Sequence, residues 1–185
     1  MGAKKDPSGR PVSLDELLEA RERRKRKQEE LLLRYGGALI SFMVNMPGAC
    51  KETLLSRNLH ALGDAWILEM VRGQNMPLLH REIVEKNTGT EGYYCIGIPP
   101  MELKREALKV EEGRPVGRLL DIDVLDQEGN ILSRSLFHLE KRKCLLCGEE
   151  AAVCARSRKH AHKDILERME EMYREAVQAG DTQAI

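Results

Sequence analysis

Gly117-Arg-Leu-Leu-Asp-Ile-Asp-Val124 is the segment that most constrains the fold, because apolar and acidic side chains alternate along it. Successive side chains of a β-strand point to opposite faces of the sheet. A strand over 116–125 therefore turns its even-numbered apolar side chains into a core, while Asp121 and Asp123 point together toward the other face. Aspartate is disfavoured in strands, so two aspartates within an apolar segment indicate a functional role.

These two carboxylates have a spacing that suits a divalent cation, since alternate residues of a strand lie roughly 7 Å apart on one face. Such a site serves phosphoryl or nucleotidyl transfer, in which the metal neutralises charge on the phosphates. Gly117 would let a phosphate approach the backbone, and the planar fork of Arg118 suits its oxygens. We predict catalytic roles for Asp121, Asp123 and Arg118, with Mg²⁺ on the aspartates. The alternative is a half-exposed strand with two solvated aspartates before a hairpin.

Outward from this strand, the sequence predicts a single α+β domain over 13–185 after a flexible leader over 1–12. The expected helices have apolar residues three and four apart and span 13–34, 55–70, 101–108 and 163–179. The expected strands are short apolar runs bounded by turn residues and span 38–44, 79–86, 92–98, 116–125 and 131–137. We expect a mixed sheet with packed helices, for which a nucleotidyltransferase-like arrangement is one candidate.

Composition excludes several classes of protein. The 185 residues include 30 Lys and Arg against 30 Asp and Glu, and only 4% are aromatic. Zero net charge argues against bulk binding to nucleic acid, and scarce aromatics argue against a base-stacking platform. No apolar run approaches the ~18 residues of a membrane span, and the first residues lack a secretory signal. Five cysteines, an odd number, indicate the reducing cytoplasm.

A possible metal site lies in the C-terminal third, where Cys144 and Cys147 form a C-x₂-C pair followed by glycine. Cys154 and His160, or His162 in place of the latter, would complete four zinc ligands. The spacing of the second half is uncommon for a zinc site, so buried or redox-inert thiols are the alternative.

Two basic segments suggest anion binding. Residues 141–160 hold six basic and two acidic side chains, a net charge of +4, and include Arg142, Arg156 and Arg158. A concentrated positive patch suits a polyanionic ligand, although a solvent-facing basic helix start is an equal alternative. Arg21–Lys27 has six basic residues in seven, which we interpret as a solvated helix surface rather than a weak anion site.

A third motif, Asn45-Met-Pro-Gly-Ala-Cys-Lys51, follows a predicted strand. The backbone amides of such a loop can bind a phosphate, with Lys51 as the counter-charge. Asn45, Gly48 and Lys51 are therefore candidate substrate-binding residues, together with Gly117, Arg142, Arg156 and Arg158. An ordinary strand-to-helix turn is the alternative.

In this order, the three motifs resemble the apo-citrate lyase phosphoribosyl-dephospho-CoA transferase family, also called holo-citrate lyase synthase. The resemblance rests on Asn45-x-Pro-Gly-x-x-Lys51, Gly117-Arg-Leu-x-Asp-x-Asp-Val124 and Arg142-x-Cys-Leu-Leu-Cys-Gly followed by Cys154-x-Arg-Ser-Arg-x-His160, and it runs from about Ser13 to His162. The family commonly has His-Pro before Gly-Arg and a proline after the loop glycine, whereas this chain has Arg114-Pro115 and Ala49.

The resemblance implies a cytoplasmic nucleotidyltransferase that matures citrate lyase by prosthetic group attachment. It would transfer 2′-(5″-triphosphoribosyl)-3′-dephospho-CoA to a serine of the citrate lyase acyl carrier protein and release diphosphate. We expect neither nucleic acid nor a membrane to take part. Two alternatives from the residues are a zinc-knuckle module that binds nucleic acid or protein, and another D-x-D nucleotidyltransferase.

Overall fold

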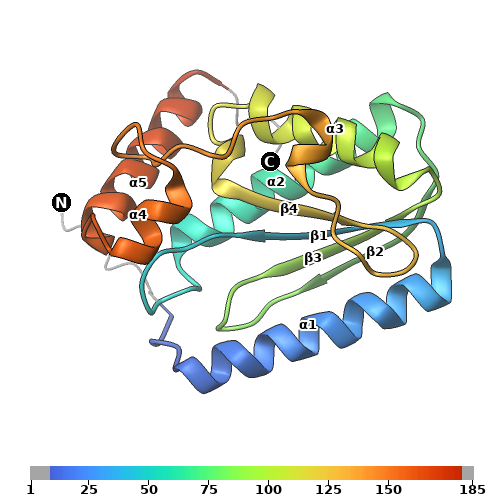
Figure 1. Ribbon diagram of the computed structural model, residues 1–185, viewed down its shortest axis with the longest axis horizontal. Coiled ribbons are helices and arrows are strands. Elements are labelled where there is room, and N and C mark those ends of the chain that lie inside the picture. Colours follow the sequence, from blue (N-terminus) through green and yellow to red (C-terminus); the bar gives the residue numbers. More distant parts are fainter. Residues whose placement is uncertain (1–8, 181–185) are drawn as a thin grey trace.

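A four-stranded sheet with the order β2-β3-β1-β4 forms the centre of the protein (Figure 1). The structure is a computed structural model that describes residues 9–180. The strands are β1 (Ala38–Val44), β2 (Leu78–Val84), β3 (Glu91–Ile96) and β4 (Leu120–Leu125). The helices are α1 (Leu14–Tyr35), α2 (Leu54–Gly73), α3 (Pro100–Gly113), α4 (Ala151–Ser157) and α5 (His162–Gln178), with short 3₁₀ turns η1 (Gly117–Leu119) and η2 (Arg134–Phe137).

The sheet confirms the α+β class and corrects one expectation about it. β1 pairs with β3 and β4, and β2 pairs with β3, and each of these pairings is antiparallel, so the sheet is not mixed. β1 and β3 are the inner strands, and the side chains of β1 are buried along nearly its whole length. β4, which carries the two aspartates, is an edge strand.

The two faces of the sheet differ in chemistry. One face packs its apolar side chains against α2, α3 and α5 in the main core, around Phe42, Trp66 and Ile122. The other face is covered by α1, whose Leu31 and Leu32 pack against Leu39, Tyr93, Cys95 and Leu125. This second face is apolar only at one end of the sheet, and the aspartates of β4 lie toward the other end, as the register of β4 against β1 requires.

Helix α1 begins at a capping box formed by Ser13 and Glu16, as the sequence predicts. Its basic segment is less solvated than we expected. Arg23 and Arg24 form ion pairs with the buried Glu91 of β3, and Lys27 pairs with Glu82 of β2. Half of the six basic side chains therefore hold α1 against the sheet.

The strand expected over 131–137 is wrong. Leu125 and Ile131 form an isolated bridge, and the residues that follow turn into η2. The outer edge of β4 is already occupied by side chains of α3, described below, so a hairpin partner cannot extend along it.

The two ends of the described chain pack differently. Residues 1–8 of the expected leader lie outside the described residues, while Gly9 and Val12 donate backbone hydrogen bonds to Glu52 and Ala49. The closing helix expected over 163–179 is α5. None of the helices within residues 9–180 is long and apolar enough to cross a membrane.

Candidate active site

Asp121 and Asp123 lie side by side on the face of β4 that turns toward α1. Their neighbours on β1 are Met43 and Ser41, respectively. Ser41 accepts a hydrogen bond from Gln28 of α1 at 2.8 Å, which fixes the helix beside the aspartates. Both aspartates are half-buried, and neither forms an ion pair with a residue in 9–180. The shared face predicted from the sequence is therefore present.

The surroundings of the two carboxylates disfavour their negative charge. Burial raises the pKa of Asp121, and the Glu111 carboxylate adds to this effect, although the nearby Arg142 opposes it. Burial and the charge of Asp121 together raise the pKa of Asp123 to about 6, against the pull of Lys104. Two close carboxylates without a direct counter-ion have the properties that a bound divalent cation would relieve.

Two buried charges on α3 hold the backbone between the aspartates. Lys104 donates from Nζ to the carbonyl of Ile122 at 3.0 Å, and Glu111 accepts from the amide of Ile122 at 3.2 Å. Their side chains are almost fully buried, and Glu111 also forms ion pairs at 2.7 Å with Arg134 and Arg142. The backbone of Ile122 is thus fixed at both polar groups, which restrains the positions of Asp121 and Asp123.

Sequence reasoning missed Lys104 and Glu111, although a signal was present. Both fall at helical spacing on the same side of α3 as the buried Ala107 and Leu108. A charged residue that recurs on an apolar helix face is costly unless it is paired, and so it indicates a specific role. Glu91, the buried first residue of β3, was also missed; it accepts a hydrogen bond from Tyr93 in addition to its two arginine ion pairs.

Arg118 and Arg142 approach β4 from its outer edge rather than from the face of the aspartates. Arg142 donates to the carbonyl of Leu120 at 3.2 Å, directly before Asp121. Arg118 is exposed on η1 and donates to the carbonyl of Lys143 at 2.5 Å. The structure brings Arg142 close to the aspartates, whereas Arg118 contacts the backbone of Lys143 and not that of β4.

Gly117 has a structural reason for being glycine. It is buried, and a Cβ at this position would lie 2.5 Å from the carbonyl oxygen of Val110 and 2.6 Å from that of Glu111. The close approach is thus between η1 and the end of α3, whereas the sequence reasoning ascribed it to a phosphate.

The loop Asn45–Lys51 lies at the end of β1 where β4 begins. Gly48 adopts a positive φ of 77° and packs near the ring of His162, at the start of α5. Lys51 donates from Nζ to the carbonyl of Met46 at 2.5 Å, and burial lowers its pKa. Asn45 is exposed. The structure brings this loop beside the C-terminal helices, while the Lys51 ammonium is engaged by its own loop.

Cys144, Cys147, Cys154 and His160, which we call the knuckle, converge on one point. Their ligand atoms all lie within 4.8 Å of one another. The Cys147 and Cys154 sulfurs are 3.5 Å apart, and Nε2 of His160 is 3.3 Å from the Cys147 sulfur. A tetrahedral Zn²⁺ with Zn–S bonds of about 2.3 Å separates its sulfur ligands by roughly 3.7 Å, so these side chains could hold a metal ion.

The backbone of the knuckle supports the same interpretation. Residues 142–151 form a small hairpin closed by hydrogen bonds from Cys144 to Glu149 and from Ala151 to Arg142. Burial alone would raise the pKa of Cys144, but backbone amides of Leu146 and Cys147 donate to its sulfur and lower the pKa overall. Amides directed at a sulfur favour the thiolate form, which is the form that binds metals.

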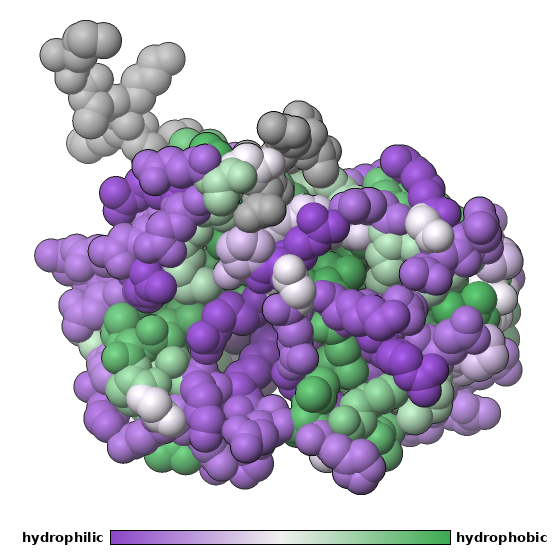
Figure 2. All heavy atoms as spheres, turned by 90° about the horizontal axis from the view of Figure 1, so that it is seen from above, coloured by the Kyte–Doolittle hydropathy of each residue, from purple (hydrophilic) through white to green (hydrophobic). Residues whose placement is uncertain are grey.

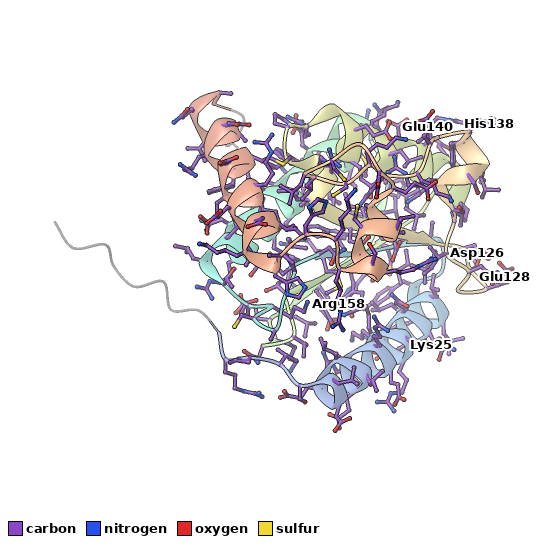
Figure 3. All side chains as sticks on the ribbon, turned by 60° about the vertical axis from the view of Figure 1, so that its left-hand side comes forward. Lys25, Asp126, Glu128, His138, Glu140 and Arg158 are labelled. Carbon is purple, nitrogen blue, oxygen red and sulfur yellow. The ribbon has the colours of Figure 1, made fainter. Side chains whose placement is uncertain are left out.

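The basic segment 141–160 is largely neutralised by neighbours. Lys141 and Lys159 pair with glutamates of the same segment, and Arg142 pairs with Glu111. Arg156 and Arg158 are exposed and form no ion pair with any residue that the structure describes. Figure 3 shows Arg158 between the C-terminal helices and α1, well away from His138 and Glu140 on the loop after β4.

Comparison with known proteins identifies the family. Residues 12–176 match the family model described as apo-citrate lyase phosphoribosyl-dephospho-CoA transferase. A Vibrio cholerae protein named as a probable member of that kind is 40% identical over 162 residues, which cover 87% of this chain and 91% of that protein. A Citrobacter koseri protein of the same name is 39% identical over 165 residues, covering 89% of this chain and 90% of its own length.

An Escherichia coli protein of this name is 38% identical over 159 residues, covering 86% of this chain and 87% of its own length. The matches confirm the resemblance that the three motifs predicted and support a transferase over the zinc-knuckle binding module. The chain, with its paired aspartates on a clamped edge strand, belongs to the apo-citrate lyase phosphoribosyl-dephospho-CoA transferase family.

Proposed function

We propose that this protein attaches the triphosphoribosyl-dephospho-CoA precursor to a serine of the citrate lyase acyl carrier protein. The serine oxygen forms a bond to the phosphorus nearest the ribose, the bond from that phosphorus to the outer diphosphate breaks, and diphosphate and a proton are released. The observation that carries the proposal is the pair Asp121 and Asp123, two half-buried carboxylates without an ion pair among residues 9–180, in a chain of this family.

Asp121 and Asp123 would hold Mg²⁺ in this proposal. Carboxylate oxygens are the usual protein ligands of Mg²⁺, and burial raises the pKa of both aspartates, so a bound cation would stabilise their ionised form. The cation would neutralise charge on the reacting phosphates. Lys104 and Glu111 restrain the strand so that both carboxylates keep their orientation when the ligand arrives.

The remaining predicted ligands surround the start of β4. Arg142 is close enough to lower the pKa of Asp121, and so it can also stabilise phosphate oxygens there. We assign Arg118 to phosphate binding at the outer edge. The loop with Asn45, Gly48 and Lys51 lies beside the same end of the sheet, and its backbone is a candidate for further phosphate contacts.

We propose Zn²⁺ as the metal of the knuckle. Three sulfurs and one imidazole nitrogen are the donor set of a structural zinc site. Zinc would hold the hairpin 142–151 in place, and this hairpin carries Arg142 to β4. Arg156 and Arg158, exposed beside the knuckle, would then contact the acyl carrier protein. We place the reaction in the cytoplasm, where thiols stay reduced; no nucleic acid takes part.

Incubation with the apo acyl carrier protein, the precursor and Mg²⁺ tests the proposal. Intact-mass spectrometry should show the carrier gaining the mass of the precursor less diphosphate, and peptide mapping should place it on one serine. A carrier with that serine replaced by alanine is the control. An unmodified carrier, under conditions in which a relative such as the Escherichia coli protein modifies it, would contradict the proposal.

A further inference from the structure

A groove of about 560 Å³ lies beside the start of β4, between the end of α3, η1, η2 and the loop that follows η2. We call it the edge groove. Its volume lies within the roughly 300–1,000 Å³ typical of small-molecule sites. Figure 2 looks onto the side of the molecule where α3 lies in Figure 1, and hydrophilic side chains cover most of this face. The charged lining residues that matter here are Glu111, Arg114, Arg118, Arg134, Arg142 and Lys143.

The edge groove carries an excess of positive charge. Five basic side chains and two acidic ones line it, a net charge of +3. Arg134 pairs with Glu111 and Glu112, Arg142 pairs with Glu111, and Arg114 pairs with Glu69 outside the groove. Arg118 has no ion pair within residues 9–180. An unpaired guanidinium group beside a loosely paired lysine, in a concave site lined by further arginines, favours a compact anion with several oxygens, which is the chemistry of a phosphate group.

The edge groove and the aspartates both lie near the first half of β4. Two lining residues bind that backbone directly, since Glu111 accepts from the amide of Ile122 and Arg142 donates to the carbonyl of Leu120. Because β4 is the edge strand, no further strand stands between the groove and the end of the sheet. A ligand bound at the aspartates would reach the groove around the start of β4, where η1 precedes the strand.

We propose that the edge groove binds the second phosphate group of the precursor, the diphosphate ester that joins adenosine to the pantetheine arm in dephospho-CoA. This inference rests on the proposed function. The precursor carries a triphosphate and, separately, this diphosphate, and the aspartate pair accounts for the first alone. Arg118 and Lys143 are the lining side chains best placed to meet it, because both are exposed and Lys143 has only a long contact of 3.9 Å to Glu140.

Calorimetric binding of dephospho-CoA, without Mg²⁺, tests the groove apart from catalysis. The wild-type protein should bind dephospho-CoA, and the double variant Arg118→Gln/Lys143→Gln should bind it at least about tenfold more weakly, because charged hydrogen bonds to phosphate are lost. Arg105→Gln, an exposed arginine on α3 outside the groove, is the matched control and should bind as the wild type does. Circular dichroism verifies that each variant is folded.

Inorganic diphosphate, the other source of the same chemistry, is measured in parallel. Binding of diphosphate by the wild type without binding of dephospho-CoA would overturn the assignment, because the groove would then receive the leaving group. Unchanged affinity of the double variant for dephospho-CoA, or no binding by the wild type, would overturn it as well.

Transfer kinetics distinguish this inference from the proposed function. If the groove holds the dephospho-CoA arm, the KM for the precursor should rise at least about tenfold in the double variant, while the KM for the carrier protein stays near that of the wild type. A double variant that transfers with an unchanged KM for the precursor contradicts the groove but leaves the transferase intact. A wild type that binds dephospho-CoA through Arg118 but modifies no carrier contradicts the transferase but leaves the groove intact.

Discussion

The two candidate metal sites of this protein are built in opposite ways. The knuckle is local, since all four of its ligands fall between Cys144 and His160, and its hairpin is closed by short-range hydrogen bonds. The aspartate site is assembled from distant segments: Asp121 and Asp123 come from β4, and Lys104 and Glu111 come from α3. The candidate ligands of a local site can be named from sequence spacing, although the choice between His160 and His162 stayed open, whereas an assembled site has its electrostatics set by parts of the chain that spacing does not connect.

The comparison predicts that the aspartate site governs catalysis and opposes stability. Asp121→Asn and Asp123→Asn should each lower the transfer rate by at least about a thousandfold, since each removes a charge that acts on the phosphates. Mass spectrometry of the carrier measures the rate. Asp15→Asn, an exposed aspartate in the first turn of α1, is the control and should leave the rate unchanged. Near-normal rates in both variants would contradict the metal assignment.

The next largest effect on the transfer rate is expected from the two contacts that hold the Ile122 backbone, which are made by Lys104 and Glu111. Lys104→Met removes the charge that favours ionised Asp123 and the hydrogen bond to the strand. We expect transfer to fall by about 10- to 100-fold at neutral pH and its acidic limb to move to higher pH. The groups that face Asp123 are Asp121, Lys104, Glu111 and Arg142, so the remaining positive charge there comes from Arg142.

Lys109→Met on the exposed side of α3 is the control for this clamp. It loses only a surface ion pair with Glu106, so neither the rate nor the pH profile should change. A uniform loss of rate in Lys104→Met without any movement of the pH profile would indicate a purely structural role for Lys104.

The knuckle should behave in the reverse manner, with a stability effect larger than its direct effect on chemistry. Cys147→Ala should abolish zinc binding, measured by elemental analysis, and lower Tm by about 5 to 10 °C, because 1 kcal/mol corresponds to roughly 2–4 °C at this size. Transfer should fall by about tenfold through the loosened hairpin of Arg142. Cys50→Ala, outside the knuckle, should keep full zinc content. Absence of zinc from the freshly purified wild type would leave these thiols without a metal role.

A smaller effect is expected on the pH dependence of stability, and it arises at the aspartate site. The pKa of Asp123 is about 6 in the folded protein and about 3.9 when unfolded, so between these values only the unfolded chain ionises and stability falls as pH rises. Asp123→Asn should therefore be more stable than the metal-free wild type by about 1 to 2 kcal/mol at pH 7.5, and the difference should shrink toward pH 4. Thermal unfolding without Mg²⁺ measures it. If the difference in Tm between Asp123→Asn and the wild type were the same at both pH values, the raised pKa of Asp123 would be contradicted.

The smallest effects are expected at Arg156 and Arg158, beside the knuckle. Replacing both with Gln should raise the KM for the carrier protein by about two- to fivefold and leave zinc content unchanged, because exposed charges contribute mainly to encounter with the partner. Arg174→Gln on the exposed side of α5 is the control. A loss confined to the precursor KM would assign these arginines to the nucleotide instead.

The sequence predicted correctly the elements that have strong local signals. It did not predict the features that depend on contacts between distant segments. The apolar run 38–44 and the turn after it predicted β1 correctly, and the alternation of β4 predicted the common face of Asp121 and Asp123. The strand over 131–137 failed because α3 side chains occupy the edge that it needed. The sequence spacing did not decide between His160 and His162 as the fourth residue of the knuckle. In the folded chain His160 lies beside Cys147, whereas His162 lies beside Gly48.

The covered edge of β4 also limits how a protein partner can approach. The carbonyls of Leu120, Ile122 and Val124 accept hydrogen bonds from Arg142, Lys104 and the amide of Leu132, in that order. A bare edge would accept an additional strand from another chain, and it would also invite aggregation. With these acceptors occupied, the sheet cannot grow beside the aspartates. In the proposed reaction, the carrier protein would therefore bring its serine to the aspartates without adding a strand to β4, and it could leave again without breaking a β-ladder.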